Sequence, residues 1–411
     1  MNGEPKPVRP GAPRVLVSTL TPGPGGVDMM ARFVVHALER HGCQPVIAHY
    51  APYRADPALS VPTFRLLQRR PQQALRKSYD GKETHAIGAW LPELEFTHYL
   101  ATGHWKHLMD SCDAFVSAAG NVLAATPFWQ TGRPYLAWVA TDWHGDRKDR
   151  IKDFPLPRRC LDAGINSPVI RRLEKKLLQS GKILSLSDYT AEMLAGITGP
   201  SFQKITLPVP VDTSFFTPRP SATVIGRIGF TGRYNDPRKN VRLLVSALAA
   251  LRQKGHEVHA VLIGDTPSQE ILHLVHRLGL QSQVEFVAAP DTQSLRDLLQ
   301  TLDVFVLPSH QEGLCIAGLE AMACGVPVVS TRCGGPQEFV IAGRTGELAG
   351  FEPTDMADAI ERIVADRPLR KRMAAAARAM VEERYTAQRA QETFWSSFVG
   401  VFPGVRSRAL G

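Results

Sequence analysis

Short apolar runs alternate along the chain with amphipathic segments whose apolar residues recur at helical spacing. The first such unit has a β-rich run at 15–20, a glycine- and proline-rich turn at 22–26 and a helical pattern over 27–40. An apolar run, a turn and an amphipathic helix repeated in this order are typical of βαβ units, which build parallel sheets. The pattern therefore predicts an α/β fold.

Two stretches interrupt this pattern. Residues 51–110 mix prolines, basic residues and aromatic residues without a clear period, and we expect an irregular insert there. Residues 208–222 are rich in proline, which cannot continue a helix or a central strand, and they predict a linker. We therefore expect two α/β domains, at 1–207 and 223–385, with a last amphipathic helix in 386–411. Strands are expected at 15–20, 46–50, 114–118, 135–140, 183–186, 205–207, 225–232, 258–264, 284–287, 304–308 and 326–330.

Composition and charge narrow the class of protein. The chain has 411 residues, enough for about two or three domains, and 44% of them are hydrophobic, which is ordinary for a globular protein. Lys and Arg number 48 against 39 Asp and Glu, so the net charge of +9 favours anionic partners. The six cysteines include no CxxC pair, which argues against a disulfide scaffold and favours a cytoplasmic location. No uncharged apolar run approaches the ~20 residues of a membrane-spanning helix, and no signal peptide is evident.

The first chemical signal is a basic loop at 230–240. A strand ends near Gly232, Arg233 and Lys239 follow, and a helix begins near residue 240. Two cations at a strand end, beside a helix N-terminus, suit a diphosphate. When the segment is taken alone, a solvated basic loop is the competing interpretation.

A stronger signal lies in residues 309–338. A strand, a turn and a helix that starts close to Leu314 leave free backbone N–H groups at the helix start, which form an anion site. Glu312 lies in the turn, and Glu320 lies eight residues later within the helix. A carboxylate beside a phosphate site is useful when it accepts hydrogen bonds from sugar or ribose hydroxyls. An acid that complements the helix dipole, followed by an ordinary helical glutamate, is the competing interpretation.

The first domain offers weaker signals. Gly25 and Gly26 follow the first strand and precede a helix, so a ligand could approach their backbone closely. The segment lacks the third glycine of a dinucleotide-binding GxGxxG motif, which disfavours that class of site. His144 lies in the segment WVATDWHGD, where a role near a substrate competes with that of a solvated histidine.

Together these motifs resemble the retaining GT-B glycosyltransferases of family four, also called glycosyltransferase group 1. Several independent elements occur in the family's order over 225–350, and the first domain matches more weakly through GPGGV, WVATDWHGD and LSLSDYTAEML. The elements in the second domain are the E-x7-E motif of Glu312 and Glu320 continued as EAMACGVPVVST, the G-R-x5-K motif of Gly232, Arg233 and Lys239, LIGD at 262–265 and DVFVLPS at 303–309.

The resemblance implies a GT-B architecture, in which two Rossmann-like domains have parallel sheets facing a central cleft and the helix of 386–411 crosses back to the first domain. It also implies an enzyme that transfers a hexose from a UDP- or GDP-sugar donor to an acceptor with retention of the anomeric configuration. No Asp-x-Asp element and no His/Cys cluster predicts a metal site, so we expect no metal and no other cofactor.

By resemblance, Arg233 and Lys239 would bind the donor diphosphate and stabilise it as it leaves. Glu312 would bind hydroxyls of the donor sugar, Glu320 would bind the ribose, and His144 would lie near the reacting sugar. The full set of donor-binding residues would comprise Gly25, Gly26, Gly232, Leu314, Cys315, Ile316, Ala317 and Glu320. Cys315 and Asn240 stand where many members of the family carry glycine.

The acceptor is not identified by the sequence, because residues 51–110 match nothing in the family. A lipid-linked acceptor or a polysaccharide or glycoconjugate precursor is expected. Basic and aromatic residues within 65–107 suit an acceptor pocket, a peripheral contact with an anionic membrane at its inner face, or a solvated loop. No nucleic-acid-binding module is visible, so nucleic acid is disfavoured. A sugar-nucleotide epimerase of the same fold and a non-catalytic anion-binding protein are the alternative functions.

Overall fold

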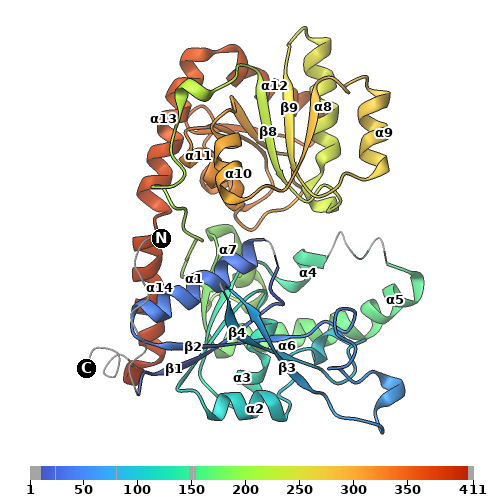
Figure 1. Ribbon diagram of the computed structural model, residues 1–411, viewed down its shortest axis with the longest axis vertical. Coiled ribbons are helices and arrows are strands. Elements are labelled where there is room, and N and C mark those ends of the chain that lie inside the picture. Colours follow the sequence, from blue (N-terminus) through green and yellow to red (C-terminus); the bar gives the residue numbers. More distant parts are fainter. Residues whose placement is uncertain (1–10, 24, 80, 148–150, 152–153, 406–411) are drawn as a thin grey trace. The chain divides into compact units, whose positions relative to one another are not determined.

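The computed structural model contains two compact units (Figure 1). The first unit holds the described residues up to Val209 together with those from Ala390 onward, and the second unit holds Pro210–Arg389. The structure describes residues 11–23, 25–79, 81–147, 151 and 154–405.

The first unit is built on a seven-stranded sheet with the order β3-β4-β2-β1-β5-β6-β7. Neighbouring strands are parallel except β3, which runs antiparallel to β4. Every residue of β5 and β6 is buried, as expected for central strands of a sheet covered on both faces. The strands are β1 (Arg14–Thr19), β2 (Gln44–Tyr50), β3 (Gln73–Ser78), β4 (Lys82–Ile87), β5 (Ala114–Gly120), β6 (Leu136–Val139) and β7 (Lys182–Ser185).

Helices of different lengths accompany this sheet, and the last of them comes from the end of the chain. The rings of Phe33 and Phe394 lie 6.1 Å apart, and Trp395 stacks on His41 at 3.9 Å, so the final helix packs within the first unit. The helices are α1 (Gly26–Arg40), α2 (Gly103–Asp110), α3 (Thr126–Gln130), α4 (Trp143–Arg147), α5 (Leu156–Leu161), α6 (Ser167–Ser180), α7 (Asp188–Thr198) and α14 (Ala387–Val401).

Two sequence-based expectations for this unit were wrong. Residues 51–110 are not an irregular insert, because they contain the β3–β4 hairpin and helix α2. Strand β3 is an edge strand with mostly exposed side chains, so no apolar run marks it in the sequence. The strand expected at 205–207 is only an isolated bridge between Thr206 and Ser185.

The second unit has a six-stranded sheet with the order β10-β9-β8-β11-β12-β13, in which all paired strands are parallel. The strands are β8 (Arg227–Gly232), β9 (His259–Gly264), β10 (Val284–Ala288), β11 (Val304–Leu307), β12 (Val328–Thr331) and β13 (Gly346–Ala349). The helices are α8 (Val241–Gln253), α9 (Gln269–Arg277), α10 (Thr292–Leu299), α11 (Ile316–Ala323), α12 (Pro353–Ala365) and α13 (Arg367–Arg384). Apolar residues of α8, α9, α12 and α13 pack with the sheet in one continuous core.

The proline-rich segment expected to be a linker is held against the second unit from Val211 onward. The Val211 N–H donates to the Tyr385 carbonyl at 2.9 Å. The Arg378 guanidinium donates to the carbonyl oxygens of Thr213 and Phe216. Hydrogen bonds from α13 and the residue after it therefore fix this part of the segment in the second unit.

Each sheet reverses its strand order once. In the second unit the chain fills one side of β8 with β9 and β10 and then returns to place β11, β12 and β13 on the other side. The reversal in the first unit lies between β1 and β5. In open parallel sheets, ligands bind outside the carboxyl ends of the strands at such a point. The loops after β8 and β11, and after β1 and β5, are therefore where a site is expected.

Candidate active site

The loop after β8 is organised by one buried carboxylate, Asp236. It accepts hydrogen bonds from the Arg238 backbone N–H at 3.1 Å and from the Arg233 guanidinium at 2.8 Å. Burial opposes ionisation of Asp236, but the hydrogen bonds and charge of Arg238, together with the charge of Arg233, lower its pKa to about 2. Asp236 is therefore ionised at neutral pH, while the Arg233 side chain stays 62% exposed and available to a ligand.

An ion pair joins this loop to the loop after β11. The Lys239 Nζ lies 2.7 Å from the Glu312 Oε1, which also accepts a hydrogen bond from the Ser309 hydroxyl at 2.7 Å. The side chains of the pair are 20% and 12% exposed. Burial disfavours the charged lysine, but the Glu312 carboxylate outweighs it and raises the pKa of Lys239 above its ordinary value. A fixed cation and a fixed carboxylate thus stand side by side at the strand ends.

The start of α11 lies directly after Glu312. Cys315 is the N-cap residue, and its side chain makes no capping hydrogen bond to this helix. The turn is locked to the loop after β12, because the Glu312 N–H donates to the Cys333 carbonyl and the Gly335 N–H donates to the Glu312 carbonyl. A Cβ on Gly335 would lie 2.1 Å from the Gly313 oxygen, so only glycine permits this approach. The amide end of α11 and Lys239 together make an electropositive site for a diphosphate.

Glu320 lies within α11, about one turn beyond its start at Ile316. Burial raises the pKa of its carboxyl group to about 7. It has no ion-pair partner among the residues that the structure describes. A poorly hydrated carboxyl group of this kind is suited to a ligand that brings hydroxyl donors.

The remaining predicted site residues belong to the first unit. Gly25, with a φ of 141°, precedes α1, and Gly26 is the first residue of that helix, after β1 at the strand-order reversal. His144 lies on α4 and is exposed, with its Nδ1 3.5 Å from the Arg171 Nη2. These residues form a second group, separate in the chain from Lys239.

Residues 227–380 match the family model described as glycosyl transferases group 1. A D-inositol 3-phosphate glycosyltransferase of Stackebrandtia nassauensis is 32% identical over 227 residues, covering 50% of this chain and 51% of the relative. A GDP-mannose-dependent alpha-(1-6)-phosphatidylinositol monomannoside mannosyltransferase of Mycolicibacterium smegmatis is 33% identical over 231 residues, covering 51% and 59%. Over residues 227–380 the chain is therefore similar to the glycosyltransferase group 1 family. These alignments span only about half to three fifths of the relatives' own lengths.

Solved structures show the same architecture. A sucrose-phosphate synthase from Thermosynechococcus elongatus superposes with a TM-score of 0.71 at 19% identity, covering 96% of this chain and 100% of that one. Anabaena HepE in complex with UDP also gives a TM-score of 0.71, at 16% identity and with 94% and 100% covered. The chain therefore has the GT-B fold, with two α/β domains that are each built on a mainly parallel sheet.

The two departures from the usual group 1 pattern share one backbone property. Cys315 and Asn240 have φ values of 70° and 46°, in the left-handed region. Glycine adopts this region without strain, whereas other residues do so at a cost of about 1–2 kcal/mol, with asparagine better tolerated than most. The chain keeps the conformation that glycine favours at these positions but carries side chains there.

The sequence analysis did not identify Asp236 or Ser309. Asp236 precedes a proline, and Asp-Pro is a turn signal that could have indicated its capping role. Ser309 has no comparable signal, because its partner Glu312 is recognised only from the folded turn. Among the described residues no group of three or more His, Cys, Asp or Glu is arranged to hold a metal, and none of the helices there has the length and apolar character to cross a membrane.

Proposed function

We propose that this protein is a retaining glycosyltransferase that moves a sugar from a UDP- or GDP-sugar to an acceptor. The observation that supports this most directly is the Lys239–Glu312 pair, placed at the strand-order reversal beside the open start of α11. A cation and helix N–H groups suit the diphosphate, and the carboxylate suits sugar hydroxyls. The name of the M. smegmatis relative specifies GDP-mannose and HepE is bound to UDP, which supports a donor with either nucleotide.

In the proposed reaction the bond between the anomeric carbon and the diphosphate oxygen breaks, and its electron pair stays on the diphosphate. The acceptor oxygen bonds to the same face of the anomeric carbon, and its proton passes to the departing phosphate. Lys239, Arg233 and the N–H groups of α11 stabilise the negative charge that develops. Because these groups supply fixed positive charge, we propose that a divalent metal is not required, and EDTA should leave the rate unchanged.

We also propose that the acceptor is a lipid-linked or other glycoconjugate precursor and that the first unit contacts an anionic membrane at its cytoplasmic face. Supporting this, the loop around the short helix at Thr63–Arg65 exposes apolar side chains next to arginines. Phe64 is 69% exposed and Leu67 is fully exposed. Apolar side chains among basic residues suit insertion between anionic lipid headgroups.

The experiment that tests the function is a screen of the purified full chain against a panel of UDP- and GDP-sugars, read by thermal shift and by release of nucleoside diphosphate. A ligand present at about 100 times its Kd raises the free energy of unfolding by about 2.7 kcal/mol when it binds only the folded state. We expect one nucleotide class to raise the melting temperature and to be slowly hydrolysed. Formation of an epimerised sugar nucleotide would favour the epimerase, and binding without any turnover would favour the anion-binding protein.

A further inference from the structure

Helix α4, which carries His144, depends on contacts from outside the helix. It has five residues, too few for an isolated helix to be stable. Trp143 and Arg147 are buried at its two ends, whereas His144 is exposed. The position of His144 is therefore set by whatever holds Trp143 and Arg147.

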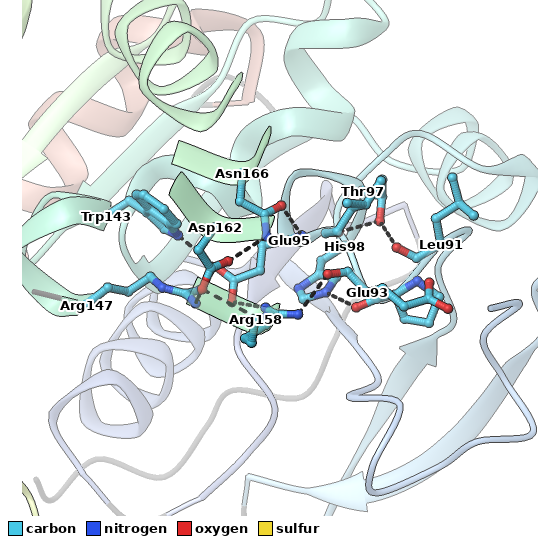
Figure 2. Close-up of polar contacts among 12 residues, drawn as sticks. Leu91, Glu93, Glu95, Thr97, His98, Trp143, Arg147, Arg158, Asp162 and Asn166 are labelled. Carbon is cyan, nitrogen blue, oxygen red and sulfur yellow. Dashed lines mark hydrogen bonds and ion pairs between the residues drawn. The ribbon is translucent and has the colours of Figure 1, made fainter. Parts of the chain in front are cut away.

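Glu95, in the short helix Glu95–Thr97, holds both residues (Figure 2). Its Oε2 accepts a hydrogen bond from the Trp143 indole N–H at 2.9 Å and pairs with the Arg147 guanidinium. Trp143 and Arg147 are four residues apart and so lie on one face of α4, and the Arg147 guanidinium lies 5.0 Å from the centre of a Trp143 ring. The Glu95 carboxylate thus contacts two side chains that are one helical turn apart. His144 is rotated from Trp143 by about 100° about the axis of α4.

A second carboxylate and a second guanidinium complete the network shown in Figure 2. Asp162 accepts from Arg147 at 3.0 Å and pairs with Arg158 at 3.5 Å, and Arg158 also lies 3.4 Å from Glu95. Asn166 donates to Asp162 at 2.7 Å and accepts from the Glu95 N–H at 3.0 Å. Asp162 and Asn166 begin and end a π-helical turn, a distortion found frequently at functional sites. The positive charges of the two arginines in this network equal the negative charges of the two carboxylates.

The segment that carries Glu95 is itself constrained. Leu91 has a φ of 50°, a left-handed conformation that persists only where the surroundings impose it. The Thr97 hydroxyl donates to the Leu91 carbonyl at 2.9 Å, the His98 Nε2 lies 3.1 Å from the Pro92 carbonyl, and the His98 ring stacks on Tyr50 at 4.1 Å. Glu95 is therefore presented from a rigid loop.

We propose that Glu95 is a positioning residue, which fixes α4 through Trp143 and Arg147 and so sets the place of His144 in the reaction. This inference rests on the proposed function, and on the resemblance to group 1 glycosyltransferases, which implies that His144 lies near the reacting sugar. A partly buried, charge-balanced network adds little net stability compared with apolar packing, but it fixes one arrangement of the groups it joins. Such fixing is what a residue near a reacting atom requires.

The first test measures backbone hydrogen exchange in the full chain without substrate. Glu95→Gln keeps an acceptor for the Trp143 indole but removes the charge that pairs with Arg147. We expect exchange at residues 143–147 to accelerate about tenfold, the effect of losing one charge-assisted hydrogen bond. Glu39→Gln is the matched control, since Glu39 pairs with Lys82 at 2.6 Å in the same unit, and it should leave that segment unchanged. Unchanged exchange in Glu95→Gln would overturn the proposal.

The second test is a double-mutant cycle with His144→Ala, measured as hydrolysis of the nucleotide sugar that the screen identifies. In the wild-type background, Glu95→Gln should lower kcat about tenfold and leave KM within about twofold. In the His144→Ala background, the same substitution should lower kcat by less than about twofold. Equal losses in both backgrounds would show a merely structural role and overturn the proposal. If Glu95→Gln does not fold, Trp143→Phe takes its place in both tests, because it removes the indole hydrogen bond to Glu95 together with part of the ring. Faster exchange in a protein whose wild type turns over no donor would support the positioning of α4 and contradict the proposed function.

Discussion

Lys239→Ala tests the chemistry proposed for the second unit most directly. The substitution removes an ammonium group that lies 2.7 Å from Glu312 and is 20% exposed. Loss of one preorganised contact to a developing charge lowers the rate by about 10²–10³, or about 3–4 kcal/mol. We expect kcat/KM for the nucleotide sugar to fall by that factor in an assay of nucleoside diphosphate release.

The same substitution leaves Glu312 only 12% exposed, with the Ser309 hydroxyl but without its cation. An unpaired polar group of this kind costs about 1–3 kcal/mol of stability, and each kcal/mol lowers the melting temperature by about 2–4 °C in a domain of ~150–250 residues. Lys239→Ala combined with Glu312→Ala should recover much of the stability but none of the activity. Lys254→Ala removes an exposed lysine 2.6 Å from Glu361 and should change neither rate nor ligand shift. A kcat/KM for Lys239→Ala within about threefold of wild type would refute the reasoning, since one lost charge contact costs far more.

Three further predictions follow from particular residues. Burial raises the pKa of Glu320 from 4.5 to about 7, so the folded state loses stability as the pH rises through that interval. In urea unfolding, the stability of Glu320→Gln relative to wild type should increase between pH ~5 and ~7 and stay constant above it. A difference that does not change with pH would contradict this. At Asn240, glycine should stay within about 0.5 kcal/mol of wild type while valine costs about 1–2 kcal/mol, and equal losses would speak against a left-handed backbone there. The wild type should co-sediment with phosphatidylglycerol vesicles in preference to phosphatidylcholine vesicles. The double substitution Phe64→Ser and Leu67→Ser should abolish this binding. Equal binding by variant and wild type would exclude this loop as the contact.

The sequence predicted those helices and strands whose buried residues form a recognisable pattern within a short window. The central strands of both sheets and helices such as α10 follow from runs and periods within about ten residues. Lys239 and Glu312 were found because each lies between a predicted strand and a predicted helix, in the G-R-x5-K and E-x7-E motifs. The β3–β4 hairpin was missed because an exposed edge strand has no apolar run, and the contacts of Glu95 with Arg147 were missed because nothing in a short window records a partner so far along the chain.

In each unit a carboxylate that is at least partly buried and paired with arginine fixes a segment that carries an exposed candidate for substrate contact. Asp236 fixes the loop of Arg233 in the second unit, and Glu95 fixes the helix of His144 in the first. Because the charges of these carboxylates are already balanced by their arginines, they add little field at the proposed site. Their loss should therefore act through the geometry of Arg233 and His144 rather than through the charge that meets the donor. Substitutions of Asp236 and Glu95 should accordingly lower kcat while leaving the preference among nucleotides unchanged.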